Sequence, residues 1–192
     1  MIINGGTGNG YAMQVNEKFQ AETFSTIKTE IAEVSLDKGQ AYVVSSGFIA
    51  YTTTASFSGM IYIKNTDSEG RDMFIEHIRV CATEATTDPC HLECKIIRNP
   101  TTGTLISGAI AGNTANSNFG SSNVFNGVAY AGADATTVTD GTWFTQFINH
   151  APGHSVLDYN DSVILPKNSS IAILIKPCDA LTACCEVNVH FK

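Results

Sequence analysis

Apolar and polar positions alternate along most of the chain from Gln40 onward, with a period of two residues. β-branched and aromatic residues gather in short runs, which are separated by turns rich in Gly, Ser, Asn and Pro. Such runs predict strands, because successive side chains of a strand point to opposite faces of a sheet. The predicted strands are 41–44, 48–54, 57–65, 74–82, 92–98, 143–149, 162–165, 171–176 and 184–191.

About ten short strands at spacings of roughly 8–14 residues predict an all-β fold, a sandwich or a barrel. The connections between them are long, which favours a jelly-roll or Greek-key topology over a simple meander. No internal repeat or linker interrupts residues 40–192. We therefore expect residues 40–192 to form a single β-sandwich domain of the jelly-roll or Greek-key type.

Residues 1–39 follow a different pattern. The Gly-rich start, NGGTGNG at 4–10, lacks the preceding strand and the GK[ST] ending of a phosphate-binding loop. Further on, apolar residues recur at helical intervals of three, four and three positions: Phe24, Ile27, Ile31 and Val34. We expect an extended N-terminal arm that contains one short helix beginning at Thr29, which would cap it.

The chain also contains a long stretch without charge, because residues 99–133 include no Asp, Glu, Lys or Arg. A solvated loop of this length normally carries charge, and a membrane span needs about 20 mostly apolar residues. Loss of charge with retention of hydrogen-bonding groups is typical of the core of a protein–protein interface. The interface residues that we predict are Ile110, Asn118, Phe119, Val124, Phe125 and Tyr130. The alternative is an ordinary set of strands and turns.

The overall composition excludes two classes of partner. The chain has 192 residues with a formal net charge of −7, and it has no cluster of Lys and Arg that would indicate nucleic-acid binding. No apolar run reaches the length of a membrane span. The N-terminus lacks the basic and apolar regions of a signal peptide. We expect a protein made in a cytoplasm that binds neither nucleic acid nor membrane.

The six cysteines leave three interpretations open. The one we favour is buried thiols, with Cys94 and Cys185 as small core residues. The second is a disulfide from Cys90 to Cys178 or Cys184, which requires their loops to lie at the same end of the sandwich. The third, zinc at the Cys90–Cys94 pair, lacks a second pair of matching spacing. We expect no metal or other cofactor.

Sequence motifs of catalysis are missing as well. The five histidines are scattered, and neither a G-x-S-x-G turn nor a catalytic cysteine motif occurs. His150 and His154 lie four positions apart, but Pro152-Gly153 separates them, so the metal-binding argument for helical histidines does not apply. Facing carboxylates can be recognised only in three dimensions. We expect the protein not to be an enzyme.

Several turn sequences resemble those of small virion proteins of tailed bacteriophages. They are RNPTTGT at 98–104, NFGSSN at 118–123, LPKNSSI at 165–171 and the opening GGTGNG at 5–10. The resemblance runs loosely over nearly the whole chain, and it implies a jelly-roll-like structural protein of the head decoration or cement kind. The cysteines depart from the family pattern, so the resemblance assigns them no role.

These observations together predict a virion protein that docks on the major capsid protein and on copies of itself, as a homotrimer. The uncharged face and the arm would bury surface against neighbouring subunits. One alternative is a receptor- or glycan-binding module of a phage tail or fibre, which a cluster of exposed aromatic residues around one pocket would favour. The other is an enzyme acting on polysaccharide, which requires two facing carboxylates.

Overall fold

The computed structural model describes residues 2–4, 10–12, 35, 38–52, 56–84, 90–108, 110–178 and 183–192, and nearly all of its regular structure is β. Two short strands, β1 (Ile2–Asn4) and β2 (Gly10–Ala12), pair with each other. The predicted helix from Thr29 and most of the predicted arm lie outside the described residues.

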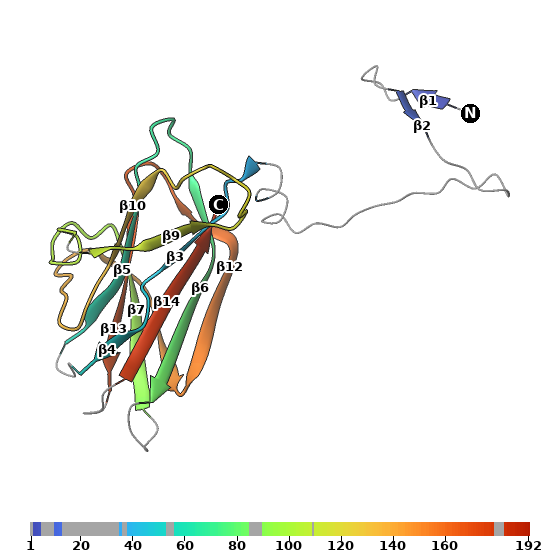
Figure 1. Ribbon diagram of the computed structural model, residues 1–192. Coiled ribbons are helices and arrows are strands. Elements are labelled where there is room, and N and C mark those ends of the chain that lie inside the picture. The colour runs from blue at the N-terminus through green and yellow to red at the C-terminus, as the bar shows by residue number, and fades with distance from the viewer. Residues whose placement is uncertain are drawn as a thin grey trace.

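The remaining strands form two antiparallel sheets that pack face to face (Figure 1). The first sheet contains, in spatial order, β11 (Thr142–Ala151), β7 (Cys90–Arg98), β13 (Ser170–Pro177), β5 (Ser58–Asn65), β10 (Gly127–Ala131) and β8 (Ile110–Ala111). The second sheet contains β12 (Gly153–Leu165), β6 (Met73–Glu84), β14 (Ala183–Phe191), β3 (Tyr42–Ser45) and β9 (Asn113–Asn116). β4 (Ile49–Tyr51) also pairs with β14.

The strand pairs are nested within one another along the chain. β3 pairs with β14, β5 with β13, β6 with β12 and β7 with β11, and successive pairs alternate between the two sheets. A long hairpin that folds over on itself gives this arrangement, which is the jelly roll. The predicted all-β sandwich is therefore confirmed.

The core occupies both faces of the first sheet. Between the sheets lies the main apolar cluster, which includes Ile63, Ile96, Ile173, Val187 and Phe191. A smaller cluster on the outer face contains Tyr62, Ile97, Leu105, Ala172 and Leu174. β5 and β13 consequently have almost every residue buried, which explains why their sequences read SGMIYIKN and SIAILIKP, with few polar residues.

The charge-free stretch belongs to an insertion, residues 99–141, at the tip of the innermost hairpin between β7 and β11. Its strands β8 and β10 extend the first sheet beyond β5, and β9 extends the second sheet beyond β3. Part of it covers the outer face of the first sheet, where Leu105 is buried. At Gly108 the backbone has a φ of 79° and lies against the ring of Tyr130, so a side chain would clash there.

Between the predicted strands 143–149 and 162–165 the sequence predicts a loop at 150–160, and this prediction is wrong. Only Pro152 separates β11 from β12, and β12 runs from Gly153 to Leu165. The ladder between β12 and β6 is interrupted between Asp158 and Val163, where Asn160 and Asp161 have positive φ values of 44° and 62°. Asn and Asp tolerate this conformation better than most residues do, so the strand continues through a polar sequence that is typical of a loop.

Candidate interaction surface

Asparagine side chains hold the loop of residues 117–126, here called the insertion loop, against Ser35, Lys38 and Gly39. The amide of Asn116 donates to the carbonyl of Gly39 at 2.7 Å, and the amide of Asn123 donates to the carbonyl of Lys38 at 2.8 Å. Asn118 donates to the carbonyl of Ser35 at 2.9 Å and accepts from the N–H of Gly120 at 3.0 Å. Several polar groups of the charge-free stretch thus form hydrogen bonds within the molecule.

Two large apolar side chains of the insertion loop point away from the protein. Phe119 is 98% exposed and Val124 is 81% exposed. The backbone next to them is ordered, because Asn118 caps the turn around Phe119 and the Val124 carbonyl accepts from the Tyr42 hydroxyl at 3.2 Å. Exposed apolar side chains mark an interaction site when they gather in one patch, and Phe119 and Val124 lie on the same loop.

Other residues predicted for the interface pack inside the molecule. Phe125 lies against Phe191 and Tyr42, with ring centroids 5.0 Å and 5.9 Å apart. Tyr130 stacks on Tyr62 at 6.0 Å, in the outer apolar cluster of the first sheet. Ile110 lies in β8, and its side chain is outside the described part of the chain. The interface remains a prediction, and Phe119 and Val124 are its exposed members.

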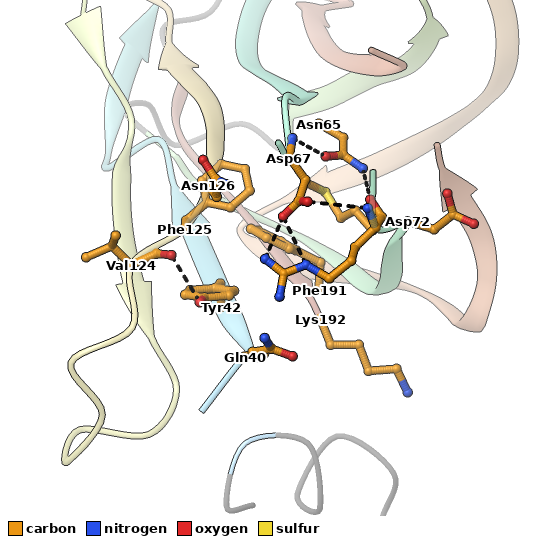
Figure 2. Close-up of a pocket in the computed structure, with 12 residues that line it drawn as sticks. Gln40, Tyr42, Asn65, Asp67, Asp72, Val124, Phe125, Asn126, Phe191 and Lys192 are labelled. Carbon is orange, nitrogen blue, oxygen red and sulfur yellow. Dashed lines mark hydrogen bonds and ion pairs between the residues drawn. The ribbon is translucent and has the colours of Figure 1, made fainter. Parts of the chain in front are cut away.

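A small hollow of about 100 Å³ lies where the insertion loop meets the body of the sandwich (Figure 2). Asp67 in its wall is buried and accepts from Nη2 and Nε of Arg71 at 2.8 and 3.2 Å. The hydrogen bond from Arg71 lowers the pKa of Asp67 to about 2. The Asp67 carboxylate also accepts from the N–H of Glu69 at 2.8 Å. These polar groups satisfy one another, so this wall is structural.

A larger hollow of about 340 Å³ lies between β9 and β10, at the margin where the two sheets separate. None of the residues that line it is charged, and Tyr42, Val124 and Phe125 line both hollows. The hollow therefore adjoins the exposed Val124 side chain. Together they form an uncharged surface on one margin of the sandwich.

The opposite margin, formed by β11 and β12, carries exposed apolar side chains that are not among the predicted interface residues. They are Trp143, Phe144, Ile148, Val156 and Ile164. The sequence contains one signal of this apolar surface, because β11 has large apolar residues at both alternating sets of positions. Because successive side chains of a strand point to opposite faces of a sheet, these residues place apolar surface on both faces of β11.

The structure places two of the cysteines in the core, as the sequence predicts for buried thiols. Cys94 and Cys185 are fully buried on the inner faces of the two sheets, and burial raises the pKa of Cys94. Cys184 is partly exposed, on the opposite face of β14 from Cys185. The preference for buried thiols is confirmed at these two positions.

The ends of the strands also meet the condition for the predicted disulfide. β7 begins at Cys90, and the N–H of Cys178 donates to the carbonyl of His91 at 2.8 Å. Cys184 pairs with Thr83, next to the end of β6, at the same end of the sandwich (Figure 1). The side chain of Cys90 lies outside the described residues, so the disulfide remains a prediction.

Four of the histidines form two cross-strand pairs. His77 and His190 stack on the outer face of the second sheet with centroids 4.1 Å apart, and His91 meets His150 at 4.5 Å. Among the described residues, no group of three or more His, Cys, Asp or Glu side chains is arranged to hold a metal ion. The described part of the chain also contains no helix long and apolar enough to cross a membrane.

Comparison of the chain with protein-family models, with curated proteins and with solved structures gives no significant match. The architecture is therefore assigned from the strand order, and the candidate surfaces are assigned from exposure, charge and packing.

Proposed function

We propose that this chain is a non-enzymatic structural protein of a virus particle, a bacteriophage decoration or cement protein that docks on the capsid. The observation that carries the proposal is the 98% exposure of Phe119 on a loop held in place by hydrogen bonds. A phenylalanine in this position gains little within its own chain, because its ring buries almost no surface there. It gains apolar contact when a partner covers it.

The surface suits docking by shape and apolar contact. Its loop is ordered before binding, so less conformational entropy is lost on association. Residues 99–133 carry no charge, so a partner need not supply ion pairs. On the capsid, burial against the major capsid protein and against neighbouring copies in a homotrimer would create the interface, for which about 1,600 Å² is a standard size.

The fold and the resemblance support this proposal in different ways. Jelly rolls are frequent in viral capsid proteins, but the same fold also occurs in lectins and cupins, so the fold alone does not select a function. The resemblance of the turns at 98–104, 118–123 and 165–171 to phage virion proteins favours the viral option. The uncharged surface lies on the insertion that contains two of these similar segments.

Receptor or glycan binding is not favoured by the geometry. The aromatic residues that would mark such a site are Tyr130, Trp143 and Tyr159. Tyr130 packs on Tyr62 in the outer cluster, Tyr159 packs against the main core, and Trp143 lies on the edge strand β11. None of the three lines either hollow beside the insertion loop.

The proposal is tested first by locating the protein. Immunogold labelling of virus particles from the source, with an antibody to residues 40–192, should decorate the head evenly. Label at a tail tip would instead favour receptor binding, and no label on any particle would contradict a virion role.

The surface is then tested with Phe119→Asp. This variant should lose at least about 90% of its co-sedimentation with particles, because a buried unpaired carboxylate opposes docking. Phe48→Asp is the matched control, since Phe48 is 63% exposed and follows the far end of β3 from the insertion loop. Normal binding by Phe119→Asp, or equal losses in both variants, would show that the insertion loop is not the docking surface.

A further inference from the structure

β11 is an open edge of the first sheet. It is the terminal strand, it is ten residues long, and β7 is its only strand partner in the described part of the chain. Its second side therefore presents backbone N–H and C=O groups that no described strand pairs. Edges of this kind readily pair with a strand of another chain, and natural proteins usually protect them.

The usual protection is missing from β11 but present in its neighbour. Residues 142–151 contain no Asp, Glu, Lys or Arg, and their one register shift lies near the start, between Trp143 and Thr145. β12 is the terminal strand of the second sheet, and there the exposed Asp158 precedes a register shift with two residues at positive φ. Charges and bulges are both devices that block edge pairing. The edge at β12 is thus closed, in the sense that it is protected against pairing with another strand, and the adjacent edge at β11 is open.

The side chains of β11 add apolar surface to the open edge. Trp143 is 61% exposed and Ile148 is 55% exposed. The ammonium of Lys95 lies 5.0 Å from the centre of the Trp143 ring, so this nearby positive charge is held over an aromatic face. The edge can therefore offer hydrogen bonds and apolar contact without an ionic partner.

We propose that a second copy of this chain pairs its own β11 with this edge, antiparallel and about a two-fold axis. The two first sheets would then form one continuous sheet across the dimer. A two-fold axis sets the strand against itself, so any charge on it would face a like charge. β11 is suited to such pairing because it carries none.

This contact does not depend on the proposed docking function. It uses β11, whereas docking uses the insertion loop at the opposite margin of the sandwich. A protein that uses both margins can bind a surface through one and join a neighbouring copy through the other. Failure of either proposal therefore leaves the other standing, because different residues test each.

The test is sedimentation velocity of the full chain between about 1 and 100 µM, a range that detects dimers of micromolar affinity. The wild type should form a dimer, and Ile148→Lys should weaken it at least about tenfold, because like charges meet across the axis. Val156→Lys is the matched control, since Val156 is 50% exposed on the closed edge of β12. This control should dimerise like the wild type.

Gln146→Glu provides a second variant that leaves the fold undisturbed. Gln146 is exposed and pairs with Lys95 of β7, so a carboxylate is tolerated there in the monomer. It should also weaken the dimer, while the thermal unfolding midpoint of the dilute protein stays unchanged. A wild type that remains a monomer throughout the range would overturn the proposal. So would an assembly that both β11 variants leave intact, or one that Val156→Lys weakens equally.

Discussion

Asparagine side chains in and next to the insertion loop hydrogen-bond to the backbone carbonyls of Ser35, Lys38 and Gly39, far away in the sequence. At the residue scale these amides replace ionic contacts, because they donate to carbonyls without bringing charge to the surface. The loop therefore stays ordered while Phe119 and Val124 remain exposed. The same stretch of sequence supplies both the fixing groups and the exposed apolar ones.

His190 gives a prediction for pH at this scale. Burial, and then the positive charges of His77 and Arg79, lower its pKa from 6.5 to about 4. As the pH falls below 6.5, the unfolded chain binds the proton first, so the folded state loses stability between pH 6.5 and about 4. The melting temperature of the wild type should therefore fall more steeply in this window than that of His190→Gln.

The control for this prediction is His154→Gln, because His154 is exposed at the start of β12. Its melting temperature should follow the wild-type curve through the whole window. Parallel curves for His190→Gln and the wild type would show that His190 contributes nothing to the acid sensitivity.

At the scale of elements, one buried leucine packs the insertion onto the first sheet, in addition to the pairing of β10 with β5. Leu105 packs against Tyr62, Ile97, Ala172 and Leu174, and it lies close to the backbone of Gly59 and Gly132. The backbone N–H of Leu105 also donates to the carbonyl of Thr137, which ties the two halves of the insertion together. The insertion is therefore part of the folded unit.

Leu105→Ala should accordingly lower the free energy of unfolding by about 2–5 kcal/mol, the usual cost of a cavity left by a buried leucine. Urea denaturation followed by tryptophan fluorescence measures this change. Val156→Ala, at an exposed position of β12 outside the proposed dimer edge, should change it by less than about 0.5 kcal/mol. A cost for Leu105→Ala as small as this would mean that the insertion is not coupled to the sheet.

The sequence predicts the class of fold and most strands, because alternation and β-branched residues are local signals. It does not predict β12 as far back as Gly153, because a register shift through Asn160 and Asp161 looks like a loop. It also treats the residues of the charge-free stretch alike, although Phe125 packs inward and Phe119 points outward. The difference arises from contacts with Tyr42 and Phe191, which are distant in sequence.

At the scale of the whole molecule, two surfaces of the sandwich lack charge while the chain as a whole carries −7. One is the insertion surface with Phe119, and the other is the β11 edge with Trp143 and Ile148. The charges lie on other parts of the chain, where their mutual repulsion limits unspecific contact between copies. This distribution separates the surfaces suited to docking from those that stay in solvent.

Binding to particles should therefore depend little on salt. Between about 0.05 and 0.5 M NaCl the apparent affinity should change by less than about threefold, because screening acts on charges and this interface contributes none. Co-sedimentation at each salt concentration measures the affinity. A steep fall with salt would indicate that charged residues outside 99–133 carry the docking.

The nesting of the strand pairs has a consequence for synthesis on the ribosome. β13 and β14, which follow all the other strands of the two sheets in the sequence, take interior positions, between β7 and β5 and between β6 and β3. Until residues 170–191 have left the exit tunnel, each sheet consists of two separate halves with unpaired edges. The sandwich therefore closes only after translation has passed β14, and a nascent chain stalled earlier would expose four edges to whatever binds them.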